Sequence, residues 1–276
     1  MVSGTEGQFL RGMNETLSMQ VNEELKLPAP ELREKLALVI PTLCEEENIG
    51  GLLNHVRSVL DPLNLPYEIV VVDDDSSDGT GAVVTAIAQE DPRVRLLVRK
   101  GQRGLSGAIL YGWKNSDAEV LGVMDADLQH PPELLPMLLS AIHRGRDIAI
   151  GSRYIHGGGV GGWNPVRKLL SSVAVWATWP LQRAKLRAKD PMSGFFMVHR
   201  SCLDQIQFQP DGFKLLLEIL VRGRIQSLEE VPYSFGARYH GASKANIKVG
   251  WDYAKLLATL YAGKFSSWFR SLTSPT

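Results

Sequence analysis

The chain has 276 residues, of which 44% are hydrophobic and 22% are charged, as in an ordinary soluble globular protein. This composition excludes a disordered chain, a collagen-like repeat and a small disulfide-bonded scaffold. The 30 basic and 30 acidic residues cancel, which argues against a general nucleic-acid binder, but they are unevenly placed. Residues 1–130 contain 11 basic and 21 acidic residues, whereas residues 131–276 contain 19 and 9, so one half is acidic and the other basic.

The chain gives no sign of export, of a disulfide framework or of a membrane span. Cys44 and Cys202 lie far apart, so a reducing compartment is expected, and the polar, acidic N-terminus lacks the features of a secretory signal. The nearly apolar stretches at residues 134–142 and 173–181 are shorter than the roughly 20 residues that span a bilayer. We therefore expect a chain that does not cross a membrane unaided.

Residues 1–35 have no sustained periodicity and are expected to form a loosely ordered N-terminal extension. From Leu36 to about residue 155, short β-branched runs alternate with helical stretches of about a dozen residues. This alternation predicts a mostly parallel sheet with crossover helices on its faces. A glycine-rich loop at residues 157–162 follows, which is either a lid over a bound substrate or a plain surface loop.

Polar residues follow three of the predicted strands directly. Asp73, Asp74 and Asp75 come after one strand, Asp125 and Asp127 after another, and Ser152 and Arg153 after a third. Ligands of doubly wound sheets bind at the carboxyl ends of the strands, so this edge is the predicted site.

The segment Asp125-Ala-Asp-Leu-Gln129 is the sharpest of these signals. Side chains alternate along an extended segment, so Asp125, Asp127 and Gln129 would face one way and offer up to three oxygen ligands. Such a set suits a hard divalent ion, Mg²⁺ or Mn²⁺, that binds a diphosphate. The alternative is a solvated acidic loop.

The acidic run Asp73-Asp-Asp-Ser-Ser-Asp-Gly-Thr80 leads into a predicted helix. One of its carboxylates is a candidate ligand for the base or ribose of a nucleotide, although helix capping accounts for Asp78. The turn that carries Arg99 and Gly104 is either a phosphate contact or an exposed charged loop.

The basic half offers Arg153, Arg167, Arg238 and Lys244, each next to a loop or a helix start. Fixed cations at these positions would hold a second phosphate, apart from the one bound through the metal. Taken singly, each is more often a surface residue. None of the six histidines has a nucleophile partner in the sequence, so none is assigned a catalytic role.

Seven successive segments resemble the motifs of polyprenol phosphate mannosyltransferases, within the inverting glycosyltransferase family 2 that includes dolichol phosphate mannose synthase. They are IPTLCEEENI, EIVVVDDDSSDGT, RGLSGAILYGW, MDADLQHPPE, GSRY, DPMSGFFMVHR and EEVPYSFGARYHGASK. The resemblance implies a GT-A fold over residues 36–246, with a nucleotide and metal half (36–130) and an acceptor half (131–246). Residues 247–276 would form a C-terminal amphipathic, membrane-proximal helix and tail.

The resemblance also implies roles for individual residues. The metal ligands would be Asp125, Asp127 and Gln129; the nucleotide site would comprise Pro41, Glu45, Asp73, Asp74, Arg99, Gly104 and Ala126; and the acceptor phosphate would meet Arg153, Arg167, Ser171, Arg238, Ser243 and Lys244. Asp190 and Ser193 would lie beside the sugar, and Asp127, Arg153 and Arg238 would carry the catalysis.

The expected reaction is transfer of mannose from GDP-mannose to a polyprenyl phosphate, with inversion at the anomeric carbon. Family members commonly read P-T-Y-N-E where this chain has Pro41-Thr-Leu-Cys-Glu45, so the identity of the base stays open. The alternatives are a polyprenol phosphate glucosyltransferase that uses UDP-glucose, a soluble sugar-nucleotide hydrolase, and a non-enzymatic receiver-type module that binds metal and phosphate.

A lipid acceptor implies peripheral contact with the cytoplasmic face of a membrane. Basic residues near an anionic leaflet contribute roughly 1 kcal/mol each, and tryptophans settle at the interface. The candidates are Trp176, Trp179, Trp251, Trp268 and Phe269, although Trp176 and Trp179 are equally compatible with a place in the core.

Overall fold

The computed structural model describes residues 34–160, 165–204, 206–208, 214–234, 253–262 and 264, and for residues 165–170 the backbone alone. All of them belong to one compact unit, Glu34–Thr276. Residues 1–33 and most of 247–276 lie outside the described part. The predicted division into extension, catalytic domain and tail therefore stays a prediction.

The centre of this unit is a seven-stranded sheet in the order β3-β2-β1-β4-β6-β5-β7. All neighbouring strands are parallel except β6, which is antiparallel to both β4 and β5. The strands are β1 (Leu36–Thr42), β2 (Tyr67–Asp73), β3 (Val94–Val98), β4 (Val120–Val123), β5 (Ile148–Ser152), β6 (Phe196–His199) and β7 (Leu228–Pro232). The predicted fold class, a mostly parallel sheet flanked by helices, is confirmed.

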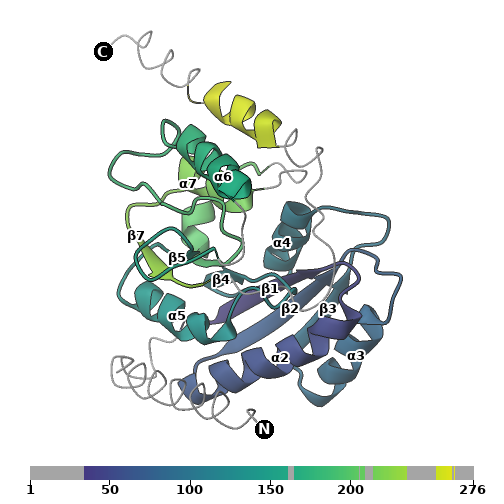
Figure 1. Cartoon of the computed structure of the whole chain (residues 1–276). Helices are drawn as coiled ribbons and strands as arrows, with labels where there is room; N and C mark the ends of the chain where they lie inside the picture. The colour runs from purple at the N-terminus through teal and green to yellow at the C-terminus, as the bar shows by residue number, and fades with distance from the viewer. Residues whose placement is uncertain are drawn as a thin grey trace, which may run out of the picture. The chain divides into compact units, whose positions relative to one another are not determined.

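Helices cover both faces of the sheet, with α2, α3 and α5 on one face and α4 and α7 on the other (Figure 1). The α-helices are α2 (Glu46–Leu60), α3 (Thr80–Glu90), α4 (Leu105–Lys114), α5 (Leu135–His143), α6 (Pro165–Thr178) and α7 (Leu215–Arg222), and a further helix occupies residues 253–262. Short 3₁₀ turns are η2 (Asp61–Leu63), η3 (Pro132–Leu134) and η4 (Arg200–Leu203). A strand covered on both faces is expected to be apolar throughout, and this is why β1 reads Leu-Ala-Leu-Val-Ile.

The helix α4 packs unusually close to the sheet. A Cβ built on Gly112 would lie 2.8 Å from both methyl groups of Val39 in β1 and 3.0 Å from a methyl group of Val72 in β2. One residue further on, Trp113 is 3% exposed and packs edge-to-face on Phe196 of β6, with ring centroids 6.2 Å apart. Glycine at position 112 therefore sets the depth at which α4 sits on the strands.

The direction of the strands decides which loops meet. Because β1, β2, β4 and β5 are parallel, their carboxyl ends share one edge of the sheet. The strand β6 runs the opposite way, so the same edge receives its start: Phe196 is opposite Val123 of β4 and Ile150 of β5. The residues before Phe196 are thereby brought beside those that follow Val123 and Ser152.

Substituting Gly112 by alanine tests this packing. The added methyl group would overlap the valine methyl groups of β1 and β2, and overpacking of this kind costs about 1–3 kcal/mol of the free energy of unfolding. The matched control is Gly51→Ala, because Gly51 is an exposed residue of α2 whose built Cβ meets nothing within 4 Å. That variant is expected to gain about 0.5–1 kcal/mol from helix propensity. Urea unfolding of both variants measures the difference, and equal midpoints would contradict the close packing.

Candidate active site

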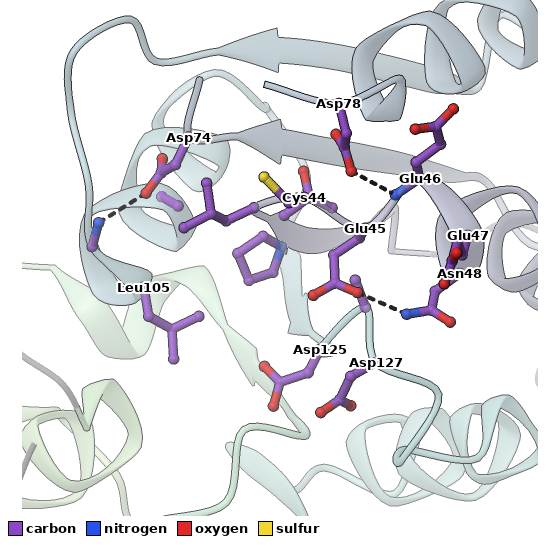
Figure 2. A pocket seen from close by; sticks show the side chains of 16 residues that line it. Cys44, Glu45, Glu46, Glu47, Asn48, Asp74, Asp78, Leu105, Asp125 and Asp127 are labelled. Carbon is purple, nitrogen blue, oxygen red and sulfur yellow. Dashed lines mark hydrogen bonds between the residues drawn. The ribbon is translucent and has the colours of Figure 1, made fainter. Parts of the chain in front are cut away.

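A pocket of about 730 Å³ opens at the carboxyl edge of the sheet. Its walls come from the end of β1 and the start of α2, from the loop after β2, from the start of α4, and from the turn after β4. The lining residues are Pro41 to Asn48, Asp74, Asp78, Gly104, Leu105, Ala108 and Asp125 to Asp127. Carboxylates are prominent in it: Figure 2 shows Asp125 and Asp127 side by side on one wall, with Glu45 nearby.

The turn after β4 presents Asp125 and Asp127 to the pocket. Both residues are partly exposed, whereas Ala126 between them is buried. The turn closes tightly: the backbone N–H of Gln129 donates to Oδ1 of Asp127 over 3.2 Å, and Leu128 has a φ of 58°. A positive φ is uncommon for a residue with a branched side chain, so the surrounding contacts must hold this turn in place.

The start of α2 and the start of α3 cap each other at the rim of the pocket. The carboxylate of Asp78 accepts a hydrogen bond from the backbone N–H of Glu46 over 3.2 Å, and that of Glu46 accepts one from the backbone N–H of Gly79 over 2.9 Å. Each carboxylate meets the positive end of the other helix. The side chain of Glu45 is held by Asn48, whose amide donates to it over 2.8 Å.

The three adjacent aspartates at the end of β2, Asp73 to Asp75, turn in three different directions. The carboxylate of Asp73 is buried and accepts hydrogen bonds from the Thr42 hydroxyl over 3.1 Å and from the Ser76 backbone and hydroxyl. Asp75, with a φ of 57°, accepts from the backbone N–H of Gly101 over 3.3 Å. Neither Asp73 nor Asp75 lines the pocket.

Asp74 does line the pocket, and it contacts the loop that precedes α4. Its carboxylate accepts a hydrogen bond from the backbone N–H of Gly104 over 2.8 Å and lies 3.1 Å from Nε of the buried Arg99. Burial raises the pKa of Asp74, and the Gly104 hydrogen bond and the Arg99 charge oppose that rise. Arg99 therefore supports Asp74 from within and is not among the lining residues.

A buried ion pair lies at the start of the loop after β5. Arg153 donates to Asp190 three times: from Nε over 2.7 Å, from Nη2 over 2.8 Å and from its backbone N–H over 3.0 Å. Asp190 is 0% exposed, and its own backbone N–H donates to Glu230 of β7 over 3.0 Å. Burial alone would lower the pKa of Arg153, but the hydrogen-bonded Asp190 carboxylate raises it.

Sequence reasoning missed a cation beside this pair. Lys214 precedes α7, and its ammonium group donates to the carbonyl of Met192 over 3.4 Å. Burial, and then the nearby Arg153 charge, lower the pKa of Lys214 to about 8, while Asp125 and Asp190 act in the opposite direction. The charges of Arg153, Asp125 and Asp190 therefore all act on this one ammonium group. A lysine directly before the three leucines at residues 215–217 was the available signal.

The structure brings only part of the predicted set together. Of the predicted nucleotide and metal residues, those that line the pocket are Pro41, Glu45, Asp74, Gly104, Asp125, Ala126 and Asp127. Asp73, Arg99 and Gln129 do not line it. Of the predicted acceptor and sugar residues, Ser171 lies 2.6 Å from the Tyr154 hydroxyl, and Ser193 accepts a hydrogen bond from the backbone N–H of Phe195 over 3.1 Å.

The side chains of four predicted acceptor residues fall outside what the structure describes. Only the backbone of Arg167 is described, and Arg238, Ser243 and Lys244 lie outside the described residues. The glycine-rich loop is described up to residue 160: Gly159 forms an isolated bridge with Ser234, and its backbone N–H donates to the carbonyl of Tyr233 over 3.1 Å. This part of the loop therefore lies against the end of β7.

The chain matches known proteins over most of its length. Residues 37–216 match the family model "Glycosyl transferase family 2". The chain is 36% identical over 244 residues to a dolichol-phosphate mannosyltransferase of Mycosarcoma maydis, covering 84% of this chain and 80% of that one. It is 35% identical over 241 residues to a dolichol-phosphate mannosyltransferase of Saccharomyces cerevisiae, covering 84% and 88%.

A longer relative and a solved structure are also similar. A dolichol-phosphate mannosyltransferase of Pyrococcus furiosus is 43% identical over 222 residues, which are 80% of this chain but only 62% of that relative. Glucosyl-3-phosphoglycerate synthase of Mycobacterium tuberculosis, solved with Mn²⁺, UDP-glucose and phosphoglyceric acid, superposes with a TM-score of 0.63 at 20% identity over 88% of this chain and 82% of that one. This second likeness is one of fold.

The Arg153–Asp190 pair leads to a stability prediction. Asp190→Asn removes the negative charge and leaves the Arg153 guanidinium buried without its counter-charge, which is expected to cost about 3 kcal/mol of the free energy of unfolding. The control is Asp204→Asn at an exposed aspartate, with an expected change within about 0.5 kcal/mol. Guanidinium unfolding monitored by circular dichroism makes the comparison, and similar midpoints for the two variants would show that the pair is not needed for stability.

Proposed function

The chain belongs to glycosyl transferase family 2, and we propose that it transfers mannose from GDP-mannose to a polyprenyl phosphate of the dolichyl type, with inversion at the anomeric carbon. One observation carries the proposal: Asp125 of the acidic pocket lies directly beside Gly194, in the same segment whose Asp190 holds Arg153, so the proposed donor pocket adjoins a cation for the acceptor. The relatives named dolichol-phosphate mannosyltransferase support this choice of donor sugar and acceptor.

The pocket has the size and the chemistry for the nucleotide part of the donor. Its volume of about 730 Å³ lies in the range of small-molecule and cofactor sites. Pro41 and Leu43 offer apolar surface near the end of β1, while Glu45 offers a carboxylate that Asn48 already orients. We assign the base and the ribose to this side of the pocket and the diphosphate to the side of Asp125 and Asp127.

The residues of the acidic turn fit a divalent cation. No group of three His, Cys, Asp or Glu side chains within the described ranges is arranged to hold a metal by itself. Two carboxylates on an open wall are nevertheless what Mg²⁺ and Mn²⁺ use when they bind together with substrate phosphates. Asp125 and Asp127 would hold the ion, and Gln129, which does not line the pocket, stays the predicted third ligand. When bound, it would stabilise the negative charge that develops on the departing diphosphate.

The acceptor needs little chemical activation. A phosphate monoester has a second pKa of about 6, so at neutral pH it is already mostly the dianion and no strong general base is required. The difficulty is that an anion must approach a second anion. Lys214, with a pKa of about 8, is still mostly protonated at pH 7 and can offset this repulsion.

Arg153 contributes direction more than net charge. Its charge is balanced by Asp190, and the three hydrogen bonds fix where the guanidinium points. A guanidinium held in this way has a fixed planar orientation, which suits recognition of an oxyanion. Arg167, Ser171, Arg238, Ser243 and Lys244 are proposed to complete the acceptor site, and most of these lie outside the described part.

The nearest alternative is a polyprenol phosphate glucosyltransferase that uses UDP-glucose, since the metal and acceptor chemistry is the same. A sugar-nucleotide hydrolase would release free sugar, and a receiver-type module would form an aspartyl phosphate. The two transferases and the hydrolase separate in one assay in which the purified chain is given GDP-mannose or UDP-glucose, Mg²⁺ or Mn²⁺, and a short polyprenyl phosphate, and a separate incubation with a small phosphodonor tests for the aspartyl phosphate of a receiver-type module. The expected product is lipid-linked mannose, formed from GDP-mannose only.

The variant Asp127→Ala tests the acidic turn in the same assay. Turnover is expected to fall by about 10²–10³-fold or more, because electrostatic stabilisation of the leaving group is lost. Asp117→Ala is the control: the Asp117 side chain is 84% exposed, and it pairs with Lys35 away from the pocket. Both variants should unfold at the temperature of the parent chain. Activity of Asp127→Ala within a few-fold of the parent would refute the assignment.

The face formed by α6 and the loop after it is suited to a lipid surface. Among the described residues, Trp176 is 60% exposed, Trp179 is 42% exposed and Val173 is 52% exposed, so neither tryptophan belongs to the core. Four exposed cations follow within ten residues of Trp179: Arg183, Lys185, Arg187 and Lys189. No helix that the structure describes is long and apolar enough to span a bilayer.

The helix at residues 253–262 extends this face. Its Leu256 and Leu260 pack against Leu181 and Leu217, and the Tyr261 hydroxyl donates to the carbonyl of Ala177 in α6 over 2.7 Å. We infer peripheral binding to an anionic leaflet, with the cytoplasmic face as the proposed side. Trp251, Trp268 and Phe269, the other aromatic candidates, lie outside the described residues.

Replacing both Trp176 and Trp179 by serine tests this surface. Flotation with vesicles that contain an anionic phospholipid should fall by about tenfold or more, because interfacial aromatic burial is lost while the cations remain. The matched control replaces Val98 of β3 and Tyr111 of α4 by serine. These residues are 41% and 40% exposed, and this variant should float like the parent. Equal flotation of all three proteins would exclude this face as the membrane contact.

A further inference from the structure

The acidic turn is closed by a histidine that follows it. Leu128 has a φ of 58°, a left-handed conformation that a leucine adopts at a cost, so Asp127 and Gln129 are held on either side of a strained residue. Across this turn, the backbone N–H of Asp125 donates a hydrogen bond to Nδ1 of His130 over 3.1 Å. The imidazole thus ties the last residue of the turn to the first.

The surroundings of His130 fix its ring and its protonation state. The side chain is 2% exposed, stacks on Phe195 with centroids 5.0 Å apart, and meets Tyr233 edge-on at 5.8 Å. Because Nδ1 accepts the Asp125 hydrogen bond, Nδ1 carries no proton and the ring proton is on Nε2.

The carboxylate of Asp125 is confined from the other side. A Cβ built on Gly194 would lie 2.9 Å from its Oδ2, so the backbone of the segment before β6 passes directly beside it. Phe195, the next residue, carries the ring on which His130 stacks. The same segment therefore fixes both the histidine and the space left for the carboxylate.

We propose that His130 is a positioning residue for the acidic turn: its Nδ1 holds the Asp125 backbone so that Asp125 and Asp127 are presented together to the cation and the diphosphate. This inference rests on the proposed donor site. It assigns no proton transfer to His130, whose ring faces aromatic side chains. The imidazole acts only through the turn.

Two variants separate this role from a packing role. His130→Asn retains an acceptor at the position of Nδ1 but loses the aromatic ring, whereas His130→Phe retains a ring of similar size but loses the acceptor. If the ring serves only to fill the core, phenylalanine should be the better replacement. If the Asp125 hydrogen bond is what counts, asparagine should be. His143→Phe is the matched control, because His143 is a partly buried histidine of α5 that does not line the pocket.

The readout is binding. Mn²⁺ affinity in the presence of GDP is measured by electron paramagnetic resonance, and GDP affinity without metal by calorimetry. For His130→Phe we expect Mn²⁺ affinity to fall by about tenfold or more, as when the partners that orient metal ligands are removed, with GDP affinity changed less than threefold. His130→Asn should recover Mn²⁺ affinity to within about threefold of the parent, and His143→Phe should be unchanged. Parent-like Mn²⁺ affinity of His130→Phe, or a loss in His130→Asn as large as in His130→Phe, would overturn the proposal.

A measurement on the unaltered chain covers the case in which a variant does not fold. Nitrogen-15 NMR of the histidine side chains should show His130 as the Nε2–H tautomer, with a scalar coupling between the Asp125 amide nitrogen and Nδ1. A proton on Nδ1 would overturn the inference. Failure of the proposed function looks different, since the parent chain itself would then bind neither Mn²⁺ with GDP nor GDP alone.

Discussion

The antiparallel course of β6 between two strands that run the other way is the constraint on which the site depends. A fully parallel sheet would place only strand ends at the carboxyl edge, but β6 begins there, with Phe196 opposite Val123 and Ile150. The segment from Asp190 to Phe195 is therefore laid across the ends of β4 and β5. Asp190 accepts hydrogen bonds from Arg153, Gly194 passes beside Asp125, and the ring of Phe195 stacks on His130. One reversal of direction thus organises a cation, a carboxylate and an imidazole.

Several charged residues of the site are already paired with neighbouring groups, so a count of charged residues does not describe the charge that a ligand would meet. The three aspartates at positions 73–75 all accept hydrogen bonds from, or pair with, nearby backbone, hydroxyl or guanidinium donors. Arg153 is likewise balanced by Asp190. For Asp73, Asp74 and Arg153 burial explains the partner, because an isolated charge in a poorly solvated place is costly; Asp75 is exposed. The groups proposed to meet a ligand are a smaller set: Glu45, Asp125 and Asp127, which line the pocket, and Lys214, which donates to the carbonyl of Met192.

The proposed transfer makes sense of this reduced set. A departing diphosphate is an anion that calls for a cation, and the carboxylates of the acidic turn are suited to hold one. An incoming phosphate is a second anion, and Lys214, which donates to the carbonyl of Met192 just after Asp190, is the cation proposed to meet it. On the same half of the chain, α6 exposes Trp176 and Trp179 near a run of cations, so the acceptor chemistry and the lipid-facing surface share one basic region.

Local signals in the sequence determined the order and type of the elements and most of the pocket. The run Leu36–Thr42 is mostly apolar because both faces of a central strand are covered, and such a run can be recognised in the sequence alone. The position of Asp125 and Asp127 directly after a strand was enough to place them at the carboxyl edge. Pro41, Glu45, Asp74 and Gly104 were placed by their resemblance to family motifs, and they do line the pocket.

Only the tertiary structure decided which of these groups are already engaged and what supports them. Asp73 and Asp74 are neighbours in the sequence, yet one turns to Thr42 and Ser76 and the other to Gly104, because each carboxylate goes where donors lie within reach. His130 and Lys214 carried no local signal strong enough to single them out. Their surroundings come from β6, β7 and α7, which are distant in sequence, and packing and burial are properties of such non-local contacts.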